Sequence, residues 1–468
     1  MITWSAPAVP ALPGPGLVPE IWDESARRRR PAATGPDFRL YVCGVTPYDA
    51  AHLGHARTYL LYDILRRAVL DAGVRVETAQ NVTDVDDPLL ERAARDHENW
   101  KDLATRETDR YRADMAWLRL LPPDHFEAVS DRIERIATAV RTLQTSGVAY
   151  DVPTPDALHP GDQDVYFDTA TADVALNARE VWRFGQVSHL DRPAMLAASA
   201  EHGGDPDRAG KRDPLDPLLW RAARAGEPSW TAPGLPAGRP GWHIECSLIA
   251  GDALGCDFDV QGGGSDLVFP HHEYSALHTA VLTGAPMARI FSHVGMVAYQ
   301  GEKMSKSLGN LVFVGQLRDA GLPASAVRAA LLDRPYRDDW EWHGADAAAA
   351  RARAARWAAA LAESTAASEN DGDIAGADPA AARSEGAGSE GTVSEAAEQP
   401  FETTAGAETV QALRTALAAD LDTPAALRVL DGWARAPRPG SGPLVARAAD
   451  ALLGIDLGEC RPAPTMTE

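Results

Sequence analysis

The stretch FRLYVC (38–43), followed by LGHARTYLLYDILRRAVLDAG (53–73) and RVETAQNV (75–82), decides the fold. The first segment is short, apolar and rich in strand-forming residues, and the third also reads as a strand. The segment between them has the amphipathic pattern of a helix that begins at Leu53 and ends near Gly73, a residue that favours helix termination. A strand, a helix and a strand at this spacing form a βαβ unit, which predicts an α/β fold with a parallel sheet.

The remaining chain adds further strands and helices to this unit and also contains an inserted region. Helical patterns dominate residues 88–147, and a less regular region rich in Pro, Gly and Trp covers 151–239. Strand and helix patterns then return over 256–261, 271–282 and 291–297. We therefore predict a Rossmann-like catalytic domain over 38–345, which is split by a helical and mixed insertion at about 120–240.

The two ends of the chain differ in character. Residues 1–37 are predicted to be an N-terminal extension, because prolines interrupt their apolar start and they lack the basic beginning of a signal peptide. Residues 346–468 form the predicted helical C-terminal domain. Within it, the segment 363–408 holds eleven acidic residues and one arginine without apolar periodicity. Such a segment buries too little apolar surface to offset its ordering entropy, so we predict a disordered insertion.

The composition is that of a globular protein and limits the choice of partners. Of the 468 residues 45% are apolar, and 45 Lys+Arg against 67 Asp+Glu give a net charge of −22, which argues against a general binder of nucleic acids or anionic membranes. No apolar run is long enough to span a bilayer. Four widely spaced cysteines do not suit a disulfide framework, so we expect a reduced, cytoplasmic protein.

Two short motifs could bind phosphate groups. HLGH (52–55) stands at the predicted helix start, where the helix dipole favours an anion and both imidazoles can donate to phosphate oxygens. KMSKS (303–307) places two of the chain's four lysines three residues apart in a loop, which suits a pyrophosphate that gains negative charge in a transition state. Each motif taken alone could equally be a group of solvated surface side chains.

Together the two motifs, in this order and on these elements, resemble the HIGH and KMSKS signatures of class I aminoacyl-tRNA synthetases. The resemblance implies attack of an amino-acid carboxylate on the α-phosphate of ATP, with Mg²⁺ as the companion ion, to give an acyl-adenylate and pyrophosphate. It also implies that His52 and His55 stabilise the phosphates, and that Lys303 and Lys306 stabilise the departing pyrophosphate.

Further segments resemble the cysteine-activating branch of this family, namely CGVT (43–46), NVTDVDD (81–87), PGWHIEC (240–246) and GGGSDLVFPHHE (262–273). The resemblance implies a zinc ion in the amino-acid pocket with Cys43, Cys246 and His271 as its ligands. A soft thiolate binds zinc more readily than a hydroxyl does, so zinc would separate cysteine from serine better than shape alone. The resemblance also implies an adenylate pocket lined by Cys43, Gly44, Val45, Thr46, Thr58, Asn81, Val82, Thr83, Trp242, Gly264, Ser265, Asp266 and Val297.

Ordinary structural roles remain open for some of these residues. Without the surrounding motifs, Cys246 and His271 could be plain core residues, and Asp266 could simply cap a turn. Cys256 and Cys460 match no ligand position, and we expect both to be buried thiols.

The branch contains cysteinyl-tRNA synthetases and the ligases that join cysteine to glucosaminyl-inositol in mycothiol synthesis. Val45 and Pro47, together with DDPLLERA (86–93), resemble the ligases. Ser275 stands where the synthetases carry a glutamate that binds zinc, although His202 replaces an arginine of the ligases. No Lys-rich or aromatic-interleaved segment after the KMSKS motif offers a surface for an anticodon stem.

We therefore predict an ATP-dependent ligase that forms cysteinyl-adenylate and transfers cysteine to the 2-amino group of glucosaminyl-inositol, with release of AMP. The expected partners are L-cysteine, ATP and glucosaminyl-inositol, bound by a monomer that contacts neither tRNA nor membranes. The alternatives are a cysteinyl-tRNA synthetase and a catalytically silent paralogue that senses cysteine or nucleotide. The intact HLGH and KMSKS motifs argue against the silent paralogue.

Overall fold

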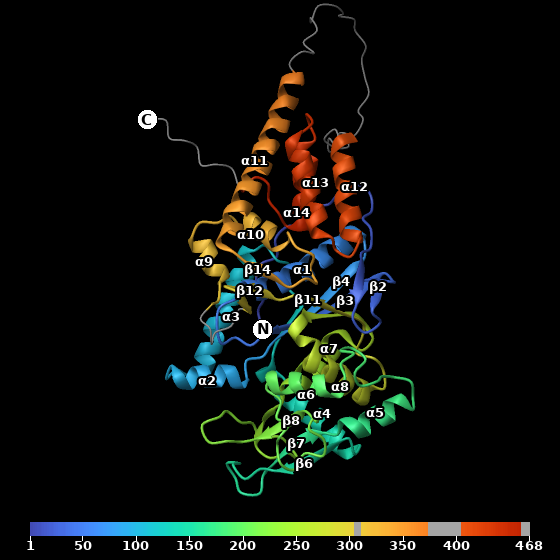
Figure 1. Cartoon of the computed structure of the whole chain (residues 1–468), viewed down its shortest axis with the longest axis vertical. Coiled ribbons are helices and arrows are strands. Elements are labelled where there is room, and N and C mark those ends of the chain that lie inside the picture. The colour runs from blue at the N-terminus through green and yellow to red at the C-terminus, as the bar shows by residue number, and fades with distance from the viewer. Residues whose placement is uncertain (304–309, 373–403, 460–468) are drawn as a thin grey trace, which may run out of the picture.

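The computed structural model describes residues 1–303, 310–372 and 404–459 (Figure 1). A five-stranded parallel sheet lies at its centre, with the strand order β11-β10-β3-β4-β5. The strands are β3 (Asp37–Val45), β4 (Arg75–Val82), β5 (His125–Ala128), β10 (Phe258–Gly264) and β11 (Ala288–Val294). The predicted Rossmann-like α/β fold is confirmed.

The βαβ unit forms as predicted. Helix α1 (Leu53–Asp71) connects the parallel strands β3 and β4. The side chain of His52 caps this helix by accepting from the N–H of Gly54. Gly73 follows the helix with a φ of +81°, which a residue with a Cβ rarely adopts. Most apolar side chains of α1 are buried in the main core, so the pattern that predicts the helix also holds it against the sheet.

The other half of the sheet consists of β10, α8 (Glu273–Thr283) and β11, which confirms the strand and helix patterns predicted there. The strand predicted at 291–297 begins three residues earlier and ends at Val294. Strand β5 lies in a region predicted to be helical. Its four residues are too few to show a recognisable alternation, and the neighbouring helices α2 (Asp87–Arg95) and α3 (Trp100–Trp117) dominate the pattern.

The inserted region lies between β5 and β10 and forms the lower part of Figure 1. Its antiparallel sheet has the strands β6 (Ala149–Pro153), β7 (Gln163–Phe167), β8 (Leu218–Ala222) and β9 (Gly238–Pro240), in that order. Its helices are η1 (Val129–Asp131), α4 (Ile133–Thr145), α5 (Thr169–Asn177), α6 (Arg192–Glu201) and α7 (Trp242–Leu254). Helix α7 brings the chain back to the central sheet, where it packs against β3 and β4.

The N-terminal segment is part of the packed structure. The hairpin of β1 (Glu20–Asp23) and β2 (Arg28–Pro31) lies beside β11, and Ile21 is fully buried. After the central sheet, the chain forms a small sheet with strands β12 (Val297–Tyr299), β13 (Glu302–Lys303) and β14 (Trp340–Trp342). The C-terminal helices are α9 (Val314–Asp319), α10 (Ala324–Leu331), α11 (Gly344–Gly372), α12 (Thr404–Ala418), α13 (Thr423–Arg435) and α14 (Gly442–Leu453).

The acidic segment 363–408 differs from the predicted disordered insertion at both of its ends. Helix α11 continues through Glu363 to Gly372, and α12 already begins at Thr404. The alanine-rich sequences that precede and follow the acidic segment favour helix. Residues 373–403 lie outside the described part of the chain. Among the described helices, none is both long and apolar enough to cross a membrane.

A buried ionic cluster joins α1 to the C-terminal helices. The carboxylate of Asp63 accepts from Arg67 at 2.8 Å, from Arg328 at 2.7 Å and from the N–H of Leu121 at 2.9 Å. Arg328 also donates to the carbonyl of Leu453 at the end of α14. Burial alone would raise the pKa of Asp63, but the charges of the two guanidinium groups outweigh it and lower the pKa to about 2.

Asp63→Asn should destabilise the protein by about 3–5 kcal/mol at neutral pH, because the amide leaves two buried guanidinium groups without a counter-charge. Urea unfolding of the variant and the wild type measures the difference. Asp37→Asn is the matched control, because Asp37 pairs with Arg75 at an exposed position, where a pair contributes less than about 1 kcal/mol. A loss for Asp63→Asn no larger than that of the control would contradict the role of the cluster.

The contribution of Asp63 should depend on pH in a defined direction. Since its pKa is lower in the folded chain than the value of about 3.9 expected in the unfolded chain, acid favours unfolding at this site. The extra stability of the wild type over Asp63→Asn should be complete above about pH 5 and decrease by about 2–3 kcal/mol as the pH falls towards 2. Urea midpoints of both proteins across this range test the expectation, and a constant difference would refute it.

Candidate active site

The predicted site residues gather at the carboxyl edge of the parallel sheet, where ligands bind in open α/β folds. Strand β3 lies between β10 and β4, so the ends of three strands that are far apart in sequence become neighbours. These strand ends carry the predicted residues Cys43, Gly44 and Val45 on β3, Asn81 and Val82 on β4, and Gly264 on β10.

Cys43, Cys246 and His271 form one buried cluster, in which one donor atom of each residue lies within 4.8 Å of the others. The two sulfurs are 3.9 Å apart, and Nε2 of His271 is 3.2 Å from Sγ of Cys246. Cys43 comes from β3, Cys246 from α7, and His271 from the π-helical turn η3 (Val268–His272) before α8. The structure thus brings together the three residues predicted as ligands, and the cluster could hold a metal ion.

Three further buried side chains surround this cluster, and the sequence analysis assigned none of them to the site. Nε2 of His272 lies 3.2 Å from Sγ of Cys43, and the side-chain amide of Gln261 donates to the same sulfur at 3.3 Å. Nδ1 of His272 is 2.7 Å from Nε2 of His293. The adjacent histidines at 271 and 272 were a signal for one of these residues, whereas Gln261 and His293 lie inside strands without such a motif.

The pKa shifts in the cluster follow from burial and from contacts between its members. Burial raises the pKa of the Cys43 thiol. Burial also acts to raise the pKa of Cys246, but the hydrogen bond with Cys43 and the charge of His271 outweigh it and lower that pKa. Burial lowers the pKa of His272 and takes that of His293 to about 3, so both imidazoles are neutral at pH 7. Of the two thiols predicted as ligands, only that of Cys246 is thus shifted towards the thiolate, the form that binds metal ions.

The residues around His271 hold its ring in one orientation. The indole of Trp242 stacks on it with the ring centroids 4.3 Å apart, and Nδ1 of His243 lies 3.0 Å from its Nδ1. The hydroxyl of Ser275 donates to the carbonyl of His243 at 3.1 Å. Within the described residues the cluster offers three donors, and three protein ligands on a tetrahedral ion leave one position for a substrate.

The histidines of the HLGH motif lie at the N-terminus of α1, as predicted. The rings of His52 and His55 stack with their centroids 3.8 Å apart. Thr58 lies one turn further along the helix and donates its hydroxyl to the carbonyl of Gly54 at 3.1 Å. A helix N-terminus with two imidazoles suits an anionic group. The assignment of these residues to ATP phosphates stays a prediction.

Other predicted residues lie around the same edge or outside the described chain. Ser265 and Asp266 belong to the turn η2 (Ser265–Leu267) that follows β10, and Val297 is buried in β12. Lys303 ends β13, and Lys306 belongs to residues 304–309, which are not among the described residues. Of the cysteines not predicted as ligands, Cys256 is half-buried rather than buried, and Cys460 lies outside the described residues.

A close backbone approach joins the ends of β3 and β4. The N–H of Gly44 and the hydroxyl of Tyr41 donate to the side-chain oxygen of Asn81 at 2.8 and 2.9 Å. The amide of Asn81 in turn donates to the hydroxyl of Thr83 at 3.0 Å. A Cβ on Gly44 would lie 1.5 Å from the backbone oxygen of Asn81, so only glycine fits at this position.

Gly44→Ala should therefore force the two strand ends apart and abolish cysteine-dependent ATP–pyrophosphate exchange. The matched control is Gly251→Ala in α7, because nothing lies within 4 Å of the Cβ that it adds. Exchange assays and thermal unfolding of both variants separate loss of the site from loss of the fold. Wild-type exchange in Gly44→Ala would show that this close approach does not shape the pocket.

Comparison with known proteins gives a consistent result. A family described as "tRNA synthetases class I (C) catalytic domain" matches residues 32–352. The L-cysteine:1D-myo-inositol 2-amino-2-deoxy-alpha-D-glucopyranoside ligase of Cellulomonas flavigena is 50% identical over 463 residues, which cover 97% of this chain and 100% of the relative. The ligase of the same name from Clavibacter michiganensis subsp. michiganensis is 50% identical over 460 residues, which cover 98% and 99%.

Solved structures with the same fold are more distant in sequence. Methionyl-tRNA synthetase of Mycobacterium tuberculosis in complex with methionyl-adenylate has a TM-score of 0.60 at 16% identity, covering 91% of this chain and 93% of that one. The leucyl-tRNA synthetase of Agrobacterium radiobacter K84 in its ternary complex also has a TM-score of 0.60, at 13% identity, covering 95% and 88%. At these identities the likeness concerns the fold alone. From the family match over most of its length and from its half-identical relatives, this chain belongs to the class I (C) tRNA synthetase family.

Proposed function

We propose that this chain is an ATP-dependent ligase that joins the carboxyl group of L-cysteine to the 2-amino group of glucosaminyl-inositol through a cysteinyl-adenylate. The observation that carries the proposal is 50% identity over nearly the full length of ligases whose names contain this donor and this acceptor. The buried pair of thiols with an imidazole supports cysteine as the amino acid, because such a soft site suits a thiol substrate.

The amino-acid pocket is proposed to contain one zinc ion held by Cys43, Cys246 and His271. The donor set supports zinc, because two thiolates and one imidazole are ligands that it prefers. Zinc would supply a soft Lewis acid that favours the sulfur of cysteine over the hydroxyl of serine. The chain's own part is to fix the ring of His271 between Trp242 and His243 and to keep the cluster away from bulk water.

The first step is attack of the cysteine carboxylate on the α-phosphorus of ATP. The new P–O bond forms as the bond to the bridging oxygen breaks, and pyrophosphate leaves with its negative charge. His52 and His55 are assigned to donate to phosphate oxygens, which their place at the N-terminus of α1 supports. Lys303 and Lys306 are assigned to neutralise the pyrophosphate, with Mg²⁺ as its companion ion.

The second step forms the amide. The ammonium group of the acceptor first loses a proton to solvent, and the resulting amine attacks the carbonyl carbon of the adenylate. The bond from this carbon to the phosphate oxygen breaks, AMP leaves, and the nitrogen gives up a second proton. We propose that the protein works in the cytoplasm, which the free thiols of Cys43, Cys246 and Cys256 support. We also propose that it is a monomer. The domain boundaries at 37/38 and 345/346 also stay predictions.

The direct test is incubation of the protein with ATP, cysteine and glucosaminyl-inositol, with tRNA in a parallel reaction. We expect equal amounts of AMP and amide product with glucosaminyl-inositol, and no cysteine on tRNA. Cysteine transferred to tRNA alone would instead establish a cysteinyl-tRNA synthetase. Absence of cysteine-dependent ATP–pyrophosphate exchange would point to the silent paralogue, and either outcome would overturn the proposal.

Variants can separate the metal from the chemistry of ATP. Cys246→Ser should lose the zinc and abolish cysteine activation, whereas Lys306→Ala should slow adenylate formation and retain the metal. Cys256→Ser is the matched control for the first variant, because this half-buried cysteine lies outside the cluster and should change neither quantity. Metal analysis and pyrophosphate exchange on the same samples give both readouts. Full zinc and full activity in Cys246→Ser would refute the ligand assignment.

A further inference from the structure

A cavity of about 370 Å³ lies at the carboxyl edge of the sheet, beside the strand ends that carry the predicted adenylate residues. Asp84 follows β4, and Ser130 and Asp131 belong to η1, which follows β5. The side walls come from α3 and from the loop between β8 and β9, which contribute Trp100 and Trp230. The size is within the range of about 300–1,000 Å³ that is usual for small-molecule sites.

The two indole rings give this cavity aromatic walls. The rings of Trp100 and Trp230 meet edge to face, with centroids 6.3 Å apart and an interplanar angle of 72°. Both side chains are half-buried, and each packs on one side against a hydrophobic cluster while it also lines the cavity. Aromatic faces of this kind pack well against the C–H faces of a sugar or cyclitol ring, which are apolar although the ring edges carry hydroxyl groups.

The floor of the cavity is polar and suits those hydroxyl groups. The carboxylate of Asp84 accepts from the backbone N–H and from the hydroxyl of Ser130. An ionised carboxylate has about four acceptor positions, so Asp84 can accept further hydrogen bonds from a ligand. Asp131 adds a second carboxylate, and Thr108 adds a hydroxyl from α3. Lys101 and Met1 also line the cavity, so it offers donors as well as acceptors and suits the hydroxyl groups of a polyol, which both donate and accept.

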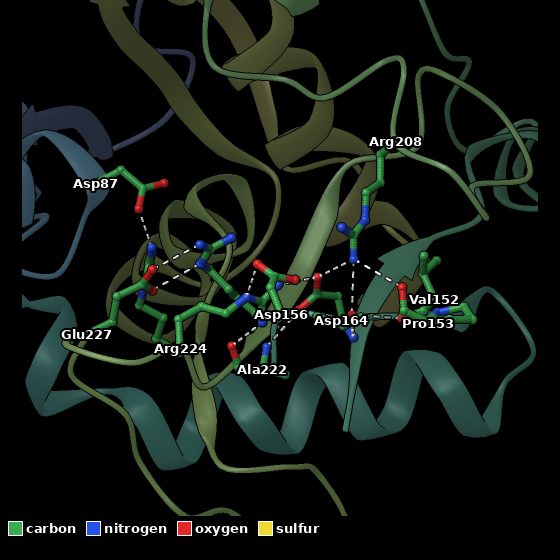
Figure 2. A network of polar contacts seen from close by, with 12 residues as sticks. Asp87, Val152, Pro153, Asp156, Asp164, Arg208, Ala222, Arg224 and Glu227 are labelled. Atoms are coloured by element: carbon green, nitrogen blue, oxygen red, sulfur yellow. Dashed lines mark hydrogen bonds and ion pairs between the residues drawn. The ribbon is translucent and has the colours of Figure 1, made fainter. Parts of the chain in front are cut away.

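An ionic network fixes the loop that carries Trp230 (Figure 2). Arg239 on β9 pairs with Asp87 at the start of α2 and donates to Glu227 at 3.3 Å, and Arg221 on β8 binds Glu227 at 2.9 Å. Trp230 itself exchanges two backbone hydrogen bonds with Gly238 next to Arg239, at 2.8 and 3.0 Å. The wall of the cavity is therefore positioned before any ligand binds.

One residue that lines the cavity directly follows the predicted adenylate residues in the chain. Asp84 directly follows Thr83, whose hydroxyl accepts from Asn81 and donates to Glu245, the neighbour of Cys246. A molecule in the cavity would thus lie next to the segment 81–83 that is predicted to line the adenylate pocket. A ring bound against the indole pair could extend a substituent across this segment.

We propose that this cavity is the acceptor subsite, which holds the polyhydroxylated ring part of the acceptor against the indole pair of Trp100 and Trp230 while its amine reaches the adenylate. The inference rests on the proposed function and adds the residues that recognise the second substrate. Asp84 and Asp131 accept from hydroxyl groups of the ring, and the indole pair covers one of its apolar faces.

Trp100→Ala and Trp230→Ala should each raise the KM for glucosaminyl-inositol about tenfold, because each removes one aromatic face. Cysteine-dependent ATP–pyrophosphate exchange should stay at the wild-type level, since the first step does not use the acceptor. Trp230→Phe should restore most of the affinity because it keeps an aromatic ring. Free myo-inositol should compete with the acceptor in the wild type and lose this effect in Trp230→Ala.

Trp117→Ala is the matched control, because Trp117 is also half-buried and lies at the other end of α3, away from the cavity. Unchanged KM values in both cavity variants, with amide formation intact, would overturn the subsite and leave the proposed function in place. Absence of amide product from the wild type would overturn the proposed function and the subsite with it. Equal loss of exchange and ligation in the cavity variants would assign the two tryptophans to the fold instead.

Discussion

The parallel pairing of β10, β3 and β4 is the constraint on which the rest of the structure depends. Parallel strands all end at one edge of the sheet. The pairing therefore places the strand ends that begin at positions 43, 81 and 264 side by side, although the chain between them is long. The long insertion between β5 and β10 does not disturb this arrangement, since it leaves the sheet at one strand end and returns through α7. Thiols, imidazoles and backbone amides from separate segments thereby share one small volume.

The parts of the fold with strong local patterns could be predicted from the sequence. The unit of β3, α1 and β4 combines apolar periodicity with a clear helix end at Gly73, and its bounds agree closely with the structure. Strand β5 was missed, because four residues between helices contain no usable periodicity. The ends of the acidic segment were also misjudged, since helices α11 and α12 extend into it through alanine-rich sequence.

Within the candidate site, the resemblance in short motifs located Cys43, Cys246 and His271, which spacing alone could not connect. The contacts of Gln261 and His293 could not be predicted, because they arise only when β10 and β11 pair beside η3. The same holds for the cavity walls, since Trp100 and Trp230 are 130 residues apart in the sequence and meet only in the folded chain. Local pattern predicts elements, whereas such clusters depend on tertiary placement.

The buried cluster of Asp63, Arg67 and Arg328 has a consequence for the order in which the chain can fold during synthesis. A growing chain leaves the ribosome N-terminus first, and domains usually fold as they emerge. Here α1 emerges early, but one guanidinium partner of Asp63 stands at position 328, and that guanidinium in turn donates to the carbonyl of Leu453. The βαβ unit that contains α1 therefore cannot complete this buried charge pairing until position 328 has been made, and Arg328 gains its carbonyl acceptor only when α14 has followed, which ties the folding of an early helix to segments made much later.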